Sequence, residues 1–153
     1  MVSRKAAVCG RFLRVAETLA DALRRRDPIA AMNRAEHIAD VDVALNVLFV
    51  CSRNQWRSPT GEQVWRRHPR VRARSAGTSA GARRVVSAAD LAWADVVLVM
   101  EDKHKFRLLA EYRALLRHKP LHVLDIPDRY KYMDPELVAL LGGPVADLLG
   151  VPR

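Results

Sequence analysis

The sequence contains little cysteine and no long apolar run. Cys9 and Cys51 are its only cysteines. They are too few for a disulfide scaffold or a four-cysteine zinc site, and such sparse use is typical of a reducing compartment. No apolar segment approaches the roughly 20 residues that span a bilayer, and the N-terminus lacks the continuous apolar stretch of a secretory signal. These absences predict a cytoplasmic protein with no membrane partner.

Glycine is also scarce, with 7 residues, and neither G-x-x-x-x-G-K nor G-x-G-x-x-G occurs. Because nucleotide-dependent enzymes hold phosphates with such loops, their absence argues against a nucleotide cofactor. His118 and His122 are four residues apart, but Pro120 between them breaks a helical register and disfavours a metal pair. We therefore expect neither a cofactor nor a metal ion.

Acidic residues are outnumbered, with 17 Asp and Glu against 26 Lys and Arg, for a net charge of +9. Between residues 57 and 84 the only acid is Glu62, and the arginines are Arg57, Arg66, Arg67, Arg70, Arg72, Arg74, Arg83 and Arg84. Such a region suits nucleic acid, anionic lipid or phosphorylated substrates, and it equally suits a solvated basic face.

Residues 1–44 differ from the rest of the chain. They are rich in Ala and Arg, and Phe12, Val15, Leu19 and Leu23 have helical spacing. Asp27-Pro28 is typical of the start of a second helix. The segment carries no chemical motif, so we expect a helical N-terminal extension followed by one domain over residues 45–153.

That second part alternates apolar runs with helical patterns. The runs cover residues 43–50, 71–75, 95–100 and 121–126, and the helical patterns cover residues 58–68, 87–94, 103–117 and 134–149. This alternation predicts an α/β fold, with a parallel sheet covered by helices on both faces. Gly142, Gly143 and Pro144 interrupt the last pattern, which leaves open whether that helix ends there.

The most informative segment follows the first run, at Cys51-Ser-Arg-Asn-Gln-Trp-Arg57-Ser58-Pro59. A loop of this length between a strand and a helix can direct backbone amides at an oxyanion, while Arg57 offers a planar fork to two of its oxygens. These charges favour the thiolate of Cys51, which is a nucleophile towards phosphorus. A cysteine at a strand end is commonly a small core residue, but the extended pattern favours a phosphate loop. The candidate phosphate-binding residues are Ser52, Arg53, Asn54, Gln55, Trp56, Arg57 and Ser58.

The chain from about residue 46 to 141 resembles the low-molecular-weight protein tyrosine phosphatase family, especially its bacterial branch. The matching segments occur in the family's order: 46–51 with Asn54 and 57–59, then 74–78, 94–101 and 125–130. The resemblance implies a phosphotyrosine phosphatase I-like (Rossmann-like) fold with a four-stranded parallel sheet. It also implies metal-independent hydrolysis of a phosphotyrosine protein or small aryl phosphate through a cysteinyl-phosphate intermediate. It places the nucleophile at Cys51, the phosphate fork at Arg57, thiolate support at Ser58 and a left-handed loop position at Asn54.

Two loop positions depart from the family. Arg53 stands where the family usually has glycine, which could disturb the loop or add charge at its rim. Trp56 replaces the family's second cysteine, so the usual disulfide partner of the nucleophile is missing. Cys9 is too remote in sequence to be assumed as a substitute.

The leaving oxygen needs a proton, and three aspartates follow the last apolar run. Register with the family selects Asp128 as the acid, with Arg129 in place of a proline. Asp125 would then be the last strand residue or a turn carboxylate, and Asp134 before Pro135 is typical of a helix N-cap. Tyr130 and Tyr132 could form walls for an aromatic leaving group, although tyrosines in a surface loop are often only packed against it.

Other functions remain open at this stage. Arg53 and the altered acid loop could leave a phosphoprotein-binding module without catalysis. An arsenate reductase on the same fold would need further cysteines, and a nucleic-acid-binding protein is supported only by the arginines. The sequence names neither the physiological substrate nor the oligomeric state.

Overall fold

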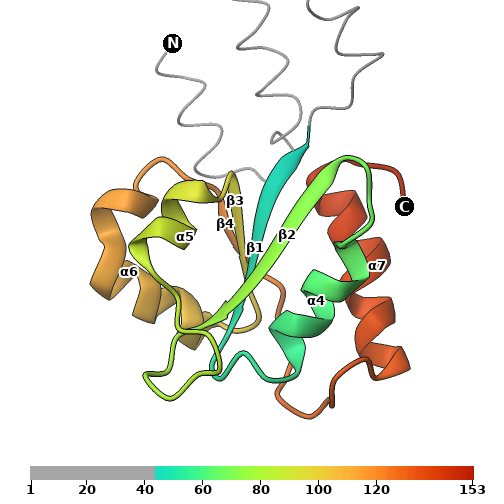
Figure 1. Cartoon of the computed structure of the whole chain (residues 1–153), viewed down its shortest axis with the longest axis horizontal. Coiled ribbons are helices and arrows are strands. Elements are labelled where there is room, and N and C mark those ends of the chain that lie inside the picture. The colour runs from blue at the N-terminus through green and yellow to red at the C-terminus, as the bar shows by residue number, and fades with distance from the viewer. Residues whose placement is uncertain (1–43) are drawn as a thin grey trace, which may run out of the picture.

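A computed structural model describes residues 44–153 (Figure 1). The helical extension expected over residues 1–44 lies outside the described residues except for Ala44, and so does Cys9. Four strands, β1 (Leu45–Cys51), β2 (Val71–Gly77), β3 (Val96–Val99) and β4 (Leu121–Val123), alternate with helices α4 (Arg57–Trp65), α5 (Ala88–Trp93), α6 (Asp102–Leu116) and α7 (Pro135–Leu149). The predicted α/β class is therefore confirmed.

The strands form one parallel sheet with the order β2-β1-β3-β4. Helices α4 and α7 cover one face and α5 and α6 the other (Figure 1). Strand β1 is buried on both sides because alternate residues enter different cores: Phe49 belongs to the cluster with α4 and α7, and Leu48 to the cluster with α5 and α6. The four-stranded parallel sheet flanked by helices is thus confirmed.

Helix α7 does not end at Gly142-Gly143-Pro144 but runs on to Leu149. Leu137, Leu141, Val145 and Leu149, spaced by four residues, are fully buried in the core. Burying this stripe stabilises the helix by more than Pro144 destabilises it through its missing amide hydrogen bond. At the other end, the Asp134 side chain accepts a hydrogen bond from Glu136 N (2.9 Å), which confirms the predicted N-cap.

The sheet brings several loops to one edge. Because the strands are parallel, the residues after β1, β3 and β4 all leave the sheet at its carboxyl edge, where open α/β folds bind ligands. The expectation that Asp125 ends the last strand is wrong. Strand β4 ends at Val123, and Asp125 is in the left-handed region (φ 58°) beyond that end.

Within residues 44–153, no helix combines the length and apolar character needed to cross a membrane.

Candidate active site

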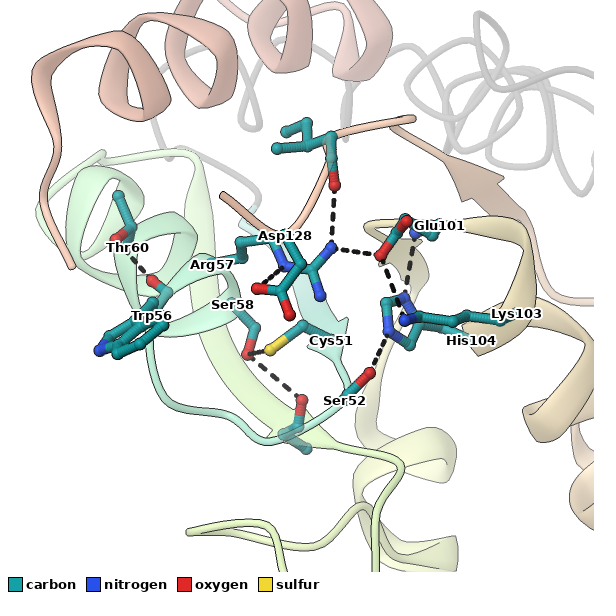
Figure 2. A network of polar contacts seen from close by, with 12 residues as sticks. Cys51, Ser52, Trp56, Arg57, Ser58, Thr60, Glu101, Lys103, His104 and Asp128 are labelled. Carbon is teal, nitrogen blue, oxygen red and sulfur yellow. Dashed lines mark hydrogen bonds and ion pairs between the residues drawn. The ribbon is translucent and has the colours of Figure 1, made fainter. Parts of the chain in front are cut away.

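The loop between β1 and α4 surrounds the Cys51 thiol. Cys51 is buried, and its Sγ lies 3.0 Å from Ser58 Oγ. The same hydroxyl accepts a hydrogen bond from Asn54 Nδ2 (2.9 Å) and lies 3.3 Å from the Ala76 carbonyl oxygen, to which it can donate. Asn54 adopts the expected left-handed conformation (φ 52°). The hydroxyl is therefore held beside the sulfur, as the sequence suggested (Figure 2).

The outer side of this loop is bound to the segment after β2. Backbone amides of Thr78, Ser79 and Arg83 donate to the carbonyls of Cys51, Ser52 and Arg53 at 2.9, 2.9 and 3.0 Å. Because a trans peptide points its C=O and N–H in opposite directions, the amides of residues 52–54 face the inner side of the loop. Successive inward amides are a suitable cradle for an oxyanion.

Arg57, the first residue of α4, is 2% exposed and is held by three residues from two segments. Its Nη1 donates to Glu101 Oε1 (2.6 Å) and to the Ile126 carbonyl (2.9 Å), and its Nε lies 3.4 Å from Asp128 Oδ1 (Figure 2). Nη1 is engaged by two acceptors and Nε faces Asp128, so an anion that takes the place of the Asp128 carboxylate at Nε can meet two donors on the edge formed by Nε and Nη2.

The loop encloses a small hollow of about 40 Å³, lined by Cys51, Ser52, Arg53, Gln55, Trp56, Arg57 and Asp128. Of the predicted phosphate-binding residues, Asn54 and Ser58 are instead buried beneath it. Arg53 is exposed, and it is not among the residues with positive φ. Its backbone conformation does not require glycine, so arginine at this position adds charge without bending the loop.

Two polar residues of the site, Glu101 and His104, were not identified as functional from the sequence. Glu101 follows β3 at the carboxyl edge and pairs with Arg57. Burial alone would raise the pKa of its carboxyl, but the hydrogen bond and charge of Arg57, with Lys103 and His104 nearby, outweigh burial and lower that pKa. Its position directly after an apolar run at the sheet edge was the signal that could have found it.

His104 links Glu101 to the loop. Its Nδ1 accepts a hydrogen bond from the Glu101 backbone amide (3.0 Å), so in the neutral ring Nε2 carries the proton and donates to Ser52 Oγ at 2.8 Å. Burial lowers the pKa of His104 to about 4, and the charge of Arg57 acts in the same direction. A neutral imidazole therefore supports the second residue of the loop near neutral pH.

Of the three candidate acids, Asp128 alone lines the hollow. Its side chain is 55% exposed, so it can exchange protons with solvent. Asp125 is exposed outside the hollow, and Asp134 caps α7.

Tyr130 and Tyr132, which were suggested as walls for an aromatic leaving group, lie in different environments. Tyr130 is only 5% exposed, packs in the core and donates its hydroxyl hydrogen to Glu136 Oε1 (3.0 Å), so it does not line the hollow. Tyr132 is half exposed and lines a larger neighbouring groove. Trp56, which is 39% exposed, is the aromatic side chain that the structure places at the rim.

In the part of the chain that the structure describes, no three His, Cys, Asp or Glu side chains gather in a way that could hold a metal ion. The arrangement instead combines an enclosed thiol, inward amides, a buried guanidinium and an exposed carboxylate around one hollow.

Scans of protein-family models and of curated proteins found no significant match. Solved structures do match. The low molecular weight protein tyrosine phosphatase from Streptococcus pyogenes is 18% identical over 69% of this chain and 91% of that protein, with a TM-score of 0.57. The YwlE arginine phosphatase from Geobacillus stearothermophilus is 20% identical over 69% and 88% (TM-score 0.53). The tyrosine phosphatase Wzb from Escherichia coli K30, in complex with phosphate, is 21% identical over 65% and 91% (TM-score 0.52).

Strand order, helix placement and these similarities lead to one conclusion: the described part of this chain has the fold of the low molecular weight protein tyrosine phosphatases.

Proposed function

We propose that this protein is a cytoplasmic phosphatase of the low-molecular-weight protein tyrosine phosphatase family, with its catalytic domain in residues 45–153. It hydrolyses phosphate monoesters through a cysteinyl-phosphate intermediate. The observation that carries the proposal is the hollow in which Cys51, Arg57 and Asp128 meet. The similarity to solved phosphatases supports it.

In the first step, Cys51 Sγ attacks phosphorus while the bond from phosphorus to the leaving oxygen breaks. Asp128, in its protonated form, gives its proton to that oxygen, so a neutral alcohol or phenol departs. Arg57 and the inward amides of residues 52–54 stabilise the equatorial oxygens. Ser58 beside Sγ stabilises the thiolate.

In the second step, water attacks the phosphorus of the cysteinyl phosphate. The Asp128 carboxylate takes a proton from that water, the S–P bond breaks, and inorganic phosphate leaves with the Cys51 thiolate restored. Both steps use groups of this chain and require no added oxidant or reductant. The substrate class that fits best is a phosphotyrosine protein or another aryl phosphate, with Trp56 at the rim as its aromatic contact.

The alternative of a phosphoprotein-binding module without catalysis receives less support. Arg53 leaves the loop backbone intact, and Asp128 lies at the hollow despite Arg129 beside it.

The test is turnover of p-nitrophenyl phosphate, a phosphotyrosyl peptide and a phosphoarginyl peptide by the purified full-length chain at mildly acidic pH with EDTA. We expect hydrolysis of the first two, and a loss of at least about a thousandfold in Cys51→Ser, because the nucleophile is weakened. That variant should still bind inorganic phosphate, since the amides and Arg57 remain. Phosphoarginine as the preferred substrate would replace the aryl assignment. Activity retained in Cys51→Ser would refute the cysteinyl mechanism.

A further inference from the structure

Beside the hollow lies a larger groove of about 520 Å³ along one side of α4. Gln55 and Trp56 line both cavities, so the groove lies next to the rim of the hollow. Tyr132, half exposed, stands on the same groove as Trp56. A second depression of about 480 Å³ shares Glu62 and Arg83 with the groove. The three cavities are therefore neighbours, with the groove between the hollow at Cys51 and the second depression.

The arginines on this surface differ in what they already bind. Arg74 and Arg84 both pair with Asp90, whose side chain is 4% exposed, and Arg74 also stacks on Trp93. Asp90 offsets one of their two positive charges, and both guanidinium groups are held in these ion pairs. Arg66 and Arg83, which line the groove, form no ion pair with another residue in the described part of the chain.

Arg83 is also hydrogen-bonded to the loop between β1 and α4. Its backbone amide donates to the Arg53 carbonyl (3.0 Å), and its Nε donates to the Asn54 carbonyl (3.2 Å). The guanidinium is thereby partly pre-organised, and its two terminal nitrogens remain as donors for a ligand. Binding a carboxylate there therefore costs less arginine side-chain entropy than binding it at a mobile arginine.

We propose that this groove binds an acidic peptide segment next to the phosphorylated residue, which makes the protein selective for phosphoproteins with acidic flanks. The inference rests on the proposed phosphatase function. Arg66 and Arg83 attract the carboxylates, while Trp56 and Tyr132 cover apolar parts of the segment.

A peptide matches the groove better than a nucleic acid strand because of Glu62. This carboxylate lines the groove and accepts a hydrogen bond from Ser75 Oγ (2.5 Å). It can accept hydrogen bonds from the backbone amides of a peptide, and the sugar–phosphate backbone of DNA has no such donors. Gln63, also on the groove, adds an amide that can both donate and accept.

The test compares kcat/KM for three phosphotyrosyl peptides of equal length, with acidic, neutral or basic flanks. We expect the acidic peptide to be preferred over the neutral one by roughly tenfold, mainly through KM, with the preference falling as salt rises. In Arg66→Glu the ratio of acidic to neutral peptide should drop to about one or below. This ratio cancels any general change in catalytic rate.

The matched control is Arg113→Glu, an equal charge change at an exposed arginine of α6, on the other face of the sheet (Figure 1). It should keep both the preference and the hydrolysis of p-nitrophenyl phosphate. Equal rates on all three peptides, or equal losses in the two variants, would overturn the groove assignment while leaving the phosphatase proposal intact.

The same peptides are also titrated into the Cys51→Ser protein, which reports on the groove independently of turnover. If the wild-type chain hydrolyses nothing, the phosphatase proposal fails, but preferential binding of the acidic phosphopeptide still supports the groove. Displacement of that peptide by a 5′-phosphorylated oligonucleotide at lower concentration than by an acidic phosphopeptide would refute the peptide assignment.

Discussion

Asp128 illustrates how one residue can be selected among similar neighbours. Three aspartates follow the last strand between residues 125 and 134, and each has the same intrinsic chemistry. The tertiary structure separates them by position: Asp128 faces Arg57 at 3.4 Å, Asp125 occupies a left-handed turn, and Asp134 caps a helix. Of the three, Asp128 is the one that lines the hollow at Cys51.

We expect Asp128→Asn to lower kcat by roughly a hundredfold on an aryl phosphate with a poor leaving group, because the amide cannot donate a proton to the departing oxygen. A strongly activated ester should lose much less. Steady-state rates on a series of substituted phenyl phosphates measure this dependence. Asp125→Asn is the matched control and should show no such leaving-group dependence. If Asp125→Asn shows this leaving-group dependence and Asp128→Asn does not, the acid is Asp125.

His104 does not line the hollow but contacts Ser52 Oγ, so under the proposed mechanism we expect it to position Ser52. We expect His104→Phe, which keeps an aromatic ring but removes both nitrogens, to weaken phosphate inhibition and to lower kcat/KM by about fivefold to tenfold, on the scale of one lost buried hydrogen bond. His104→Gln, which can still donate to Ser52, should recover most of this loss. Phosphate inhibition constants and circular dichroism check the two variants. If Gln gives no recovery while the fold is retained, the Ser52 contact has no role in positioning.

Among the elements, β2 and the segment after it determine the shape of the phosphate loop. Gly77 ends β2 in contact with the loop, and an added Cβ would lie 2.5 Å from the Ser52 carbonyl oxygen and 2.6 Å from the Ala82 Cβ. The backbone approach is therefore possible only without a side chain. Gly81, four residues later, has open space around it.

We expect Gly77→Ala to destabilise the protein by about 1 to 3 kcal/mol, the usual range for overpacking, and to reduce activity because the loop carbonyls must shift. Gly81→Ala should change neither quantity appreciably. Urea unfolding and turnover of an aryl phosphate measure both variants side by side. A Gly77→Ala protein with normal activity would mean that the β2 end does not control the loop.

Across the whole molecule, the sheet and its two helical layers bury polar groups as well as apolar ones. Two histidines are affected most. Burial lowers the pKa of His104 to about 4 and likewise that of His122 to about 4. In an unfolded chain both would titrate near 6.5. Between these values the unfolded state binds more protons than the folded state, so acid favours unfolding.

The free energy of unfolding should therefore be fully retained above about pH 6.5 and fall as the pH is lowered towards 4, by up to about 1.4 kcal/mol per pH unit for each histidine. Below that range Glu101 adds to the loss, because its lowered pKa stabilises the fold only while it is ionised. Urea titrations at several pH values measure the slope. His104→Gln should flatten it, and an unchanged slope would contradict the neutral buried state of His104.

The order of strands and helices, the loop at Cys51 and the N-cap at Asp134 could be read from the sequence. They depend on local information: apolar periodicity, the spacing of a short motif, and the preference of Asp before Pro for a helix start. The resemblance to the phosphatase family also placed Asp128 in register, although Arg129 replaces the expected proline. These features could be predicted because they depend mainly on interactions between residues that are close together in the sequence.

The tertiary structure decided the rest. Glu101 and His104 join the site because β3 pairs beside β1, which no local pattern reports. Tyr130 turned out to be a core residue, and Trp56 instead lies at the rim. Helix α7 continues through Pro144 because its buried stripe packs on the sheet. In each case the deciding free energy comes from burial and hydrogen bonds between segments far apart in the chain, and these exist only once the chain has folded.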